Sequence, residues 1–422
     1  MCKRTDDTGK RTQRKKMAKI ESSDKLKNVY SDIRGPVYEK ALEMGKAGIE
    51  VLKLNTGNPA AFGFTMPDSV KNAIVSNIDR ATAYCDAKGM PEARKAICAY
   101  HLSRGFQEIT PDDVFFGNGV SELAPMLCSS VLSHGDELLM PSPSYSLWTN
   151  AAILAGGKPV FYTCDEESGW YPDVADMEKK LTAKTKAVLI INPNNPTGQV
   201  YPPEVVEKIA DFARKHQLLL ISDEIYDRLI IDDVPFRSSA AIAPDIPVVT
   251  LNGLSKSHII CGVRCGWAVI SGPKKETEEL KGCFGKLCAM RLCGNTCGEL
   301  AVPAALSDPE STKAMLVPGG RVYEQVKAAC RALDILQEEG ILSYKAPQAA
   351  FYVFPHISEK IRIRNDKQFA FDLLAAKHIL VVAGSGFDWP QPDHFRLVLL
   401  PEAQKIYNAI LEIGDFLKTY QQ

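Results

Sequence analysis

The sequence predicts an α/β fold: a mostly parallel seven-stranded sheet sandwiched by helices, followed by a smaller α+β domain. Short runs of Val, Ile and Leu alternate with longer stretches whose apolar residues recur at helical spacing. The apolar runs are continuous, as strands buried on both faces require. After about residue 300 the alternation stops, and a long helical stretch precedes three apolar runs. This change of pattern favours a separate domain.

Each element follows from its own stretch of sequence. Seven apolar runs are predicted as strands of the main sheet: VFFGN (114–118), ELLMP (137–141), PVFYTC (159–164), AVLIIN (187–192), LLLISD (218–223), PVVTLNG (247–253) and GWAVIS (266–271). Between two of them, residues 202–216 have the spacing of an amphipathic helix. In the second domain, residues 319–340 are predicted as a helix. The three runs that follow it are residues 349–357, 379–387 and 394–400.

The chain length of 422 residues suggests two or three domains. We predict a basic tail (1–19), an N-terminal arm that completes the small domain (20–63), a large domain (64–300) and a C-terminal small domain (301–422). The tail holds eight Lys or Arg and two Asp, a net charge of +6, which leaves −7 for the rest. We interpret it as a disordered, solvated tail. KRTQRKK within it could instead be a nuclear-localisation or nucleic-acid patch, and Met17 is an alternative start.

Composition argues against several classes of protein. No apolar run approaches the roughly 18 residues that span a bilayer, and the net charge of −1 argues against a general nucleic-acid binder. No apolar segment follows the basic tail, so no secretory signal is predicted, and we expect a cytoplasmic protein. The twelve cysteines form no CxxC pair. Free thiols are therefore favoured over disulfides or zinc, and no metal site is predicted.

Polar and aromatic residues follow the predicted strands, where α/β sheets bind their ligands. GVSEL, with Ser121, follows the first strand as a Gly turn that opens a helix, which can bind an anion. Tyr145 and Trp148 follow the second strand in PSPSYSLW, where an aromatic ring could stack on a planar ligand or simply fill the core. In NPNNPTG, which follows the fourth strand, the prolines hold Asn195 rigidly.

The last two strand ends carry charge. Asp223 follows five apolar residues in LLLISDEIYD, with Tyr226 three positions on. A buried carboxylate needs a cation, either a neighbouring Lys or Arg in an ordinary ion pair or a protonated ring nitrogen. LSKS places Lys256 after the next strand, and Arg264 lies eight residues further on. A lysine amine, an acid, a phenol, an amide and an anion site at one crevice together suit pyridoxal 5'-phosphate (PLP).

The sequence resembles the fold-type I PLP-dependent aminotransferases from about Tyr30 to the C-terminus. DEIY followed by SK at this distance, together with NNPTG, is highly specific to that superfamily. The closest resemblance is to the alanine (glutamate–pyruvate) branch. Its softer motifs are NVYSDIRGPV, LNTGNPAAFGF, YCDAKGMPEARKAI, GNGVSEL, MRLCGN and LVPGGRVYEQ.

The resemblance implies a role for each matching residue around the cofactor. Lys256 would be the Schiff-base lysine that shuttles the substrate proton, and Asp223 would keep the pyridine nitrogen protonated. Tyr226 and Asn195 would hydrogen-bond the phenolate oxygen, and Tyr145 would stack on the ring. The phosphate cup would be formed by Val120, Ser121, Ser255 and Arg264.

The resemblance also implies how substrate and partner subunit are bound. Arg396 would grip the substrate α-carboxylate, assisted by the backbone of Gly57 and by Asn195. Tyr84 would reach the phosphate of the neighbouring subunit's cofactor, which implies a homodimer. His258 and His394 flank key residues, and we interpret both as packing or surface groups.

The implied activity is a ping-pong transamination of L-alanine and 2-oxoglutarate to pyruvate and L-glutamate. Alternatives are an aromatic or kynurenine-type aminotransferase, or a PLP-dependent C–S lyase of the same fold. Aminotransferase-like transcription regulators form a more distant class, for which the 19-residue tail is too short to supply a winged helix-turn-helix. Two departures from the family pattern are the cysteines in SHIICGVRCGW and the PQAA turn at residues 347–350.

Overall fold

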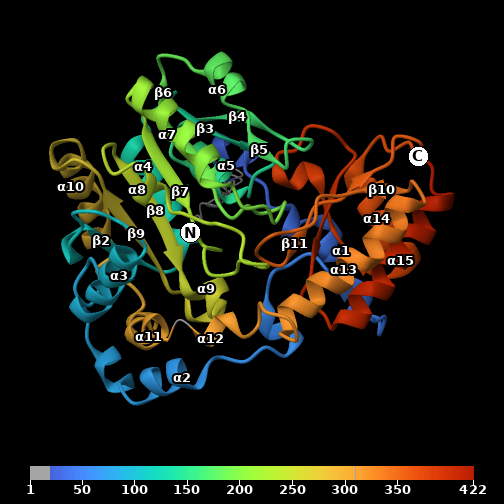
Figure 1. Cartoon of the computed structure of the whole chain (residues 1–422), viewed down its shortest axis with the longest axis horizontal. Coiled ribbons are helices and arrows are strands. Elements are labelled where there is room, and N and C mark those ends of the chain that lie inside the picture. The colour runs from blue at the N-terminus through green and yellow to red at the C-terminus, as the bar shows by residue number, and fades with distance from the viewer. Residues whose placement is uncertain (1–19, 309) are drawn as a thin grey trace, which may run out of the picture.

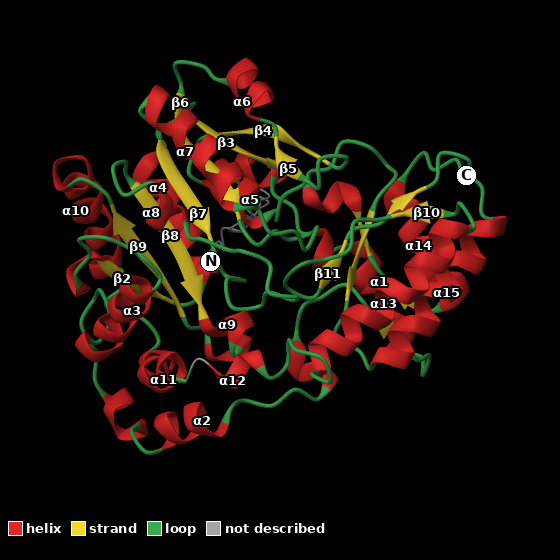
Figure 2. Ribbon diagram, viewed as in Figure 1, coloured by secondary structure: helices red, strands yellow, loops and turns green. Residues whose placement is uncertain are grey.

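The computed structural model describes residues 20–308 and 310–422, so the predicted basic tail lies outside the described residues. Its main feature is an eight-stranded sheet in the order β2-β9-β8-β7-β6-β3-β4-β5 (Figure 2). The strands are β2 (Val114–Gly117), β3 (Glu137–Ser142), β4 (Lys158–Asp165), β5 (Tyr171–Pro172), β6 (Thr185–Ile191), β7 (Leu219–Asp223), β8 (Val248–Gly253) and β9 (Gly266–Ser271). All seven predicted strands are confirmed. The prediction missed β5, whose two residues are too few to give a periodic signal.

The central strands β3, β4, β6, β7 and β8 pair in parallel, whereas β9 is antiparallel to both of its neighbours. Successive residues of a strand face opposite sides of the sheet. In β6, Val188 and Ile190 accordingly pack into one core, and Leu189 and Ile191 into the other. The sheet is therefore buried on both faces, as its continuous apolar runs predict.

Helices form the outer layers of this sheet body. The core that contains Leu189 is completed by α4 (Val120–Val131), α5 (Leu147–Leu154) and α10 (Lys274–Met290). The opposite core is completed by α3 (Pro91–Ser103), α6 (Val174–Lys180), α7 (Pro203–His216), α8 (Ser239–Ile242) and α11 (Thr296–Ser307), with α2 (Asp68–Val75) packed on α11. The helix predicted over residues 202–216 is confirmed as α7.

A C-terminal body has its own core (Figure 1). Its helices are α13 (Arg321–Glu338), α14 (Asp366–Lys377) and α15 (Ala403–Thr419), preceded by the short α12 (Glu310–Lys313). Its strands are β10 (Leu342–Ser343), β11 (Tyr352–Val353), β12 (His356–Ile357), β13 (Ile379–Leu380), β14 (Val382–Ala383) and β15 (Phe395–Val398). Helices α13 and α15 pack tightly against each other, because a Cβ on Gly414 would overlap Leu336.

The N-terminal arm joins this C-terminal body. Strand β1 (Leu52–Lys53) pairs in parallel with β13, and α1 (Pro36–Lys46) contacts α14. Figure 1 shows the blue α1 lying among the orange and red C-terminal helices. This is the association predicted for residues 20–63, although the boundaries at residues 64 and 301 stay a prediction. Among the described helices, none is both long and apolar enough to cross a membrane.

The strand directions bring the predicted site residues to one edge of the sheet. Strands β6, β7 and β8 are parallel, and β2 shares their direction because β9 is antiparallel to both β8 and β2. Asn195 follows β6, Asp223 ends β7, and Lys256 lies in the four-residue helix α9 (Leu254–Ser257) directly after β8. Their side chains therefore start from the same carboxyl edge.

Candidate active site

One cavity of about 940 Å³ collects the predicted residues. Eleven of the twelve line it: Gly57, Val120, Ser121, Tyr145, Asn195, Asp223, Tyr226, Ser255, Lys256, Arg264 and Arg396. The exception is Tyr84, whose side chain is 78% exposed and does not line this cavity. The cavity is formed by the sheet edge, the N-terminal arm and the C-terminal body, so it depends on segments far apart in the sequence.

Lys256 enters the cavity from the first turn after β8. Its Nζ donates a hydrogen bond to the Gly57 carbonyl oxygen at 3.1 Å and lies 5.9 Å from the centre of the Phe351 ring. Lys256 has no carboxylate within ion-pair distance in the part of the chain that the structure describes. A lysine held by one carbonyl rather than by an acid remains available as a nucleophile when it is deprotonated.

Asp223 is buried at the end of β7 and is held by two donors. Trp148 Nε1 donates to Oδ2 at 3.0 Å, and the Ile225 backbone N–H donates to Oδ1 at 3.3 Å. Burial raises the pKa of Asp223 to about 6, against the opposing effects of these hydrogen bonds and of the Lys256 charge. Among the residues that the structure describes, no cation forms an ion pair with Asp223, so a positively charged group entering the cavity would stabilise its ionised form. Trp148 is fully buried, so it supports the acid rather than stacking on a ligand.

A cationic, glycine-lined cup lies at the start of α4. Arg264 has a left-handed backbone (φ 58°), and it donates to the carbonyl oxygens of Cys261 at 2.8 Å and Asn118 at 3.0 Å. The guanidinium packs so closely on Gly119 that a Cβ there would overlap it. No ion pair of Arg264 is found among the described residues. Beside it, the first free N–H groups of α4 add positive potential, so the cup suits a phosphate.

Arg396, in β15, is a second arginine of the same cavity and is fully buried at 1% exposure. Its Nη1 donates to Asn195 Oδ1 at 3.0 Å and its Nη2 donates to the Asn55 carbonyl oxygen. The guanidinium lies 4.6 Å from the centres of both the Tyr352 and Phe387 rings. Its Nε has no partner and no carboxylate pairs with it in the described chain, and burial lowers its pKa. A buried cation without a carboxylate is a strong site for an anionic ligand.

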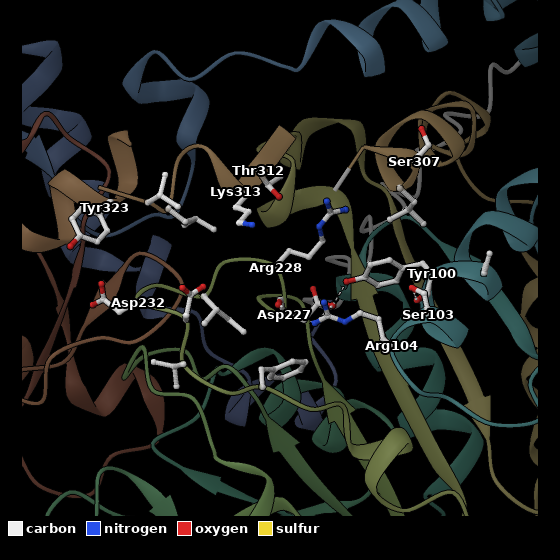
Figure 3. Close-up of a pocket in the computed structure, with 18 of the residues that line it drawn as sticks. Tyr100, Ser103, Arg104, Asp227, Arg228, Asp232, Ser307, Thr312, Lys313 and Tyr323 are labelled. Atoms are coloured by element: carbon white, nitrogen blue, oxygen red, sulfur yellow. Dashed lines mark hydrogen bonds and ion pairs between the residues drawn. The ribbon is translucent and has the colours of Figure 1, made fainter. Parts of the chain in front are cut away.

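Tyr226 is buried, and its hydroxyl lies 3.0 Å from that of Tyr352. The turn that carries Tyr226 is held at the next residue, Asp227. Tyr100 donates its hydroxyl proton to Asp227 Oδ2, and Arg104 donates to the Asp227 carbonyl oxygen at 3.4 Å. These residues line a separate cavity of about 1130 Å³ (Figure 3) that shares no lining residue with the first. The turn that carries Tyr226 is therefore anchored from behind.

Several residues of the cavity were not predicted. Tyr352 contacts both Tyr226 and Arg396, and Arg34 and Cys261 line the cavity. Arg34 belongs to the motif NVYSDIRGPV, and a cation in that motif was the only sequence signal for it. Cys261 donates to Asn58 Oδ1 at 3.4 Å. Of the two histidines interpreted as packing or surface groups, His258 is a packing group, buried between Ser257 and the Ala305 carbonyl oxygen.

Comparison with known proteins agrees with this geometry. Residues 49–410 match the family model described as aminotransferase class I and II. The chain belongs to that family. It is 43% identical over 407 residues to the glutamate–pyruvate aminotransferase AlaA of Escherichia coli, covering 96% of this chain and 100% of that protein. It is 45% identical over 402 residues to an alanine aminotransferase of Mycobacterium bovis, covering 95% and 93%.

Solved structures give the same result for the fold. A crystal structure of an aminotransferase from Escherichia coli matches with a TM-score of 0.93 at 42% identity, covering 96% of this chain and 100% of that one. An alanine aminotransferase from Pyrococcus furiosus matches with a TM-score of 0.89 at 36% identity, covering 95% and 100%. The chain is therefore an enzyme of the transaminase class, with the fold predicted from its motifs.

Proposed function

We propose that this aminotransferase uses PLP to convert L-alanine and 2-oxoglutarate to pyruvate and L-glutamate by a ping-pong cycle. The observation that carries the proposal is Arg396, a buried guanidinium without a carboxylate partner in the described chain. Both amino acids and both oxo acids carry an α-carboxylate that it can bind. The names of the Escherichia coli and Mycobacterium bovis relatives support the choice of alanine and glutamate.

The donor set of the cavity fits PLP. Arg264 and the start of α4 offer a phosphate site, and Asp223 offers a buried carboxylate whose pKa is raised to about 6 by burial. Such an acid is stabilised by a protonated ring nitrogen. Tyr226, Asn195, Ser255, Ser121 and Val120 lie around the same cavity, and Tyr145 adds a ring that can stack on the cofactor.

PLP, when bound, supplies an aldehyde and an electron-poor ring that stabilises negative charge developing at the substrate Cα. The protein's residues perform the remaining tasks. Lys256 would hold the cofactor through its aldehyde, and its Nζ would carry a proton to and from the substrate Cα. Asp223 would keep the ring nitrogen protonated. Arg396, with the Gly57 backbone and Asn195, fixes the carboxylate and hence the direction of the Cα–H bond.

Arg34 supports a dicarboxylate as the second substrate. It is an exposed residue lining the cavity, and no hydrogen bond or ion pair of its side chain is found in the described chain. The distal carboxylate that 2-oxoglutarate and glutamate both carry would give it a partner, whereas alanine would leave it solvated. Aromatic or kynurenine-type donors and C–S lyase chemistry remain the alternatives within this fold.

A panel of amino donors assayed with 2-oxoglutarate as acceptor tests the proposal. We expect alanine to give the highest kcat/KM, with formation of glutamate and pyruvate in equal amounts. Greater activity with aromatic donors or kynurenine would refute the alanine assignment. Release of ammonia and pyruvate from cysteine-type substrates without any oxo acid would instead identify a lyase.

The homodimer and the cytoplasmic location are part of the same proposal. Tyr84, Val75 and Met290 are exposed at 78%, 63% and 78%. The segments that carry Tyr84 and Met290 are adjacent, because Arg291 Nη2 donates to the Ala87 carbonyl oxygen at 3.4 Å. Exposed apolar side chains on neighbouring segments are typical of a subunit interface, and sedimentation of the pure protein with and without Tyr84→Ser would test it.

A further inference from the structure

His394 is a buried histidine that the proposed chemistry does not use. It immediately precedes β15, two residues before Arg396, and its side chain is 2% exposed. Phe354 and His356 stack on its ring at 4.9 Å, and Trp170 and Trp389 meet it edge-on at 5.3 and 5.1 Å. Its burial agrees with the packing interpretation, but its polar contacts go beyond packing.

Two carboxylates face this ring. Nδ1 lies 2.6 Å from Asp393 Oδ1, and Nε2 lies 3.3 Å from Glu166 Oε2 without forming a directed hydrogen bond. Asp393 is also bound by Trp389 Nε1 at 2.9 Å and lies 3.7 Å from His356 Nε2. Burial alone lowers the pKa of His394, but the two carboxylates outweigh it and the net pKa is raised. The imidazolium is therefore the stabilised form.

The two carboxylates come from different parts of the molecule. Glu166 and Trp170 lie in the turn between β4 and β5 of the sheet body, whereas Asp393 and His394 lead into β15 of the C-terminal body. The side chain of Glu166 is 17% exposed, so water screens this ion pair only partly. His394 thus forms an ionic contact between the two bodies.

Packed side chains connect this contact to Arg396. Phe354, stacked on His394, meets the Phe387 ring edge-on at 6.1 Å, and Phe387 lies directly against the Arg396 guanidinium. The backbone adds a second connection, because the His394 carbonyl oxygen accepts a hydrogen bond from the Gly384 N–H at 2.8 Å. Gly384 begins the short 3-10 helix that ends at Phe387. A shift of His394 would therefore move one of the two rings that hold Arg396.

We propose that His394 is a positioning residue whose ion pair with Glu166 ties the C-terminal body to the β4–β5 turn and so holds Arg396 in its carboxylate-binding position. The inference rests on the carboxylate-binding role proposed for Arg396. Because the pKa of His394 is raised, the ion pair with Glu166 is fully formed at pH values below the ordinary histidine pKa of about 6.5. It is lost as the pH rises through the higher folded-state value. The KM for both substrates should therefore rise as the pH rises. Loss of this ion pair should leave kcat nearly constant.

Glu166→Gln is the decisive variant, because it removes the charge with little change in volume, and Glu167→Gln is its matched control. Glu167 is the next residue, its side chain is 87% exposed, and it pairs only loosely with Lys345 at 3.7 Å. Steady-state kinetics of the PLP-loaded enzyme would be measured between about pH 6 and 9 for L-alanine and 2-oxoglutarate. At pH 6, Glu166→Gln should raise both KM values about three- to tenfold, which lies within the roughly two- to thirtyfold range expected for coupling through packed side chains.

The same variant should flatten the rise of KM with pH, and Glu167→Gln should keep the wild-type profile. An unaltered pH profile in Glu166→Gln, or a loss confined to kcat, would overturn the proposal. His394→Gln should show, at every pH, the KM that the wild-type enzyme reaches at high pH. If this variant fails to fold, Glu166→Gln alone decides the question. NMR titration of the His394 ring separates this inference from the proposed function, because Glu166→Gln should lower its pKa whether or not Arg396 binds substrate. An unchanged His394 pKa would refute the tie itself.

Discussion

Replacing Arg396 with lysine tests whether this residue recognises substrate or only stabilises the fold. The guanidinium makes two hydrogen bonds, to Asn195 and Asn55, and lies 4.6 Å from the centres of two aromatic rings. Lysine keeps the charge but loses the planar fork that binds a carboxylate through two parallel N–H donors. Losing one charge-assisted hydrogen bond costs about 1.5–3 kcal/mol. This corresponds to a loss of about 10- to 160-fold in kcat/KM.

The loss should affect both half-reactions, because alanine and 2-oxoglutarate present the same α-carboxylate. The assay is kcat/KM for each substrate, with bound PLP measured in parallel to confirm that the cofactor site is intact. Arg362→Lys, at an exposed position, is the matched control and should be silent. If Arg396 were an ordinary structural arginine, the substitution would change stability rather than turnover. An unchanged kcat/KM for either substrate would refute the assigned role.

Four further outcomes follow from the same cavity. Lys256→Ala should abolish transamination while PLP still binds without a covalent link, and substantial turnover without added amines would contradict this. Asp223→Ala should cut the rate more than tenfold, about 1.4 kcal/mol, and a smaller loss in kcat would reassign Asp223 to structure. Equilibrium dialysis should show PLP binding to the cofactor-free protein weakening as the pH falls through about 6, because burial raises the pKa of Asp223 to that value and protonation removes the charge that binds the ring nitrogen. Arg34→Gln should raise the Michaelis constant for the oxo-acid acceptor up to about fivefold, because an exposed ion pair contributes about 0–1 kcal/mol. The Michaelis constant for alanine should be unchanged.

The sequence predicted the parts of the site that lie at strand ends. Lys256, Asp223 and Asn195 follow long apolar runs, and parallel strands necessarily bring such residues to one edge. Arg264 was placed at the same edge from its position eight residues after Lys256, whereas Arg396 was placed by resemblance alone. What these predictions share is a strong local signal, either a continuous buried strand or a dense turn.

The features that were missed depend on contacts between distant segments. Trp148 donates a hydrogen bond to Asp223, 75 positions away in the sequence, and the Tyr352 hydroxyl lies 3.0 Å from that of Tyr226, 126 positions away. Neither contact leaves a periodic trace in the chain. His394 was interpreted as a packing or surface group because one histidine before a strand gives no indication of a carboxylate on another body. Long-range polar pairing of this kind requires coordinates.

The PQAA turn shows how a departure from a family pattern can be tolerated. Ala350 has φ +60°, where a glycine would be relaxed, and a residue with a Cβ costs roughly 1–2 kcal/mol in that conformation. The neighbouring backbone compensates: Gln348 and Ala349 both donate to the Gly198 carbonyl oxygen at 2.9 Å, and Ala350 donates to that of Leu229 at 2.8 Å. The turn is therefore held by the sheet body rather than by its own sequence.

If Arg396 binds the substrate carboxylate as proposed, binding requires both bodies of the molecule, because the contacts of Arg396 join them. The guanidinium belongs to β15 of the C-terminal body, yet it donates to Asn195, which follows β6 of the sheet body. That hydrogen bond orients the fork, so a carboxylate that binds it need not order a flexible side chain and loses less entropy on binding. The carboxylate must also approach Arg396 while Arg396 keeps its hydrogen bond to Asn195. Because Asn195 has an amide nitrogen as well as the oxygen bound to Arg396, it can donate to the same carboxylate without releasing the arginine. In the proposed binding mode, specificity for an α-carboxylate would thus come from two residues, Arg396 and Asn195, that hold each other in place from opposite sides of the cavity.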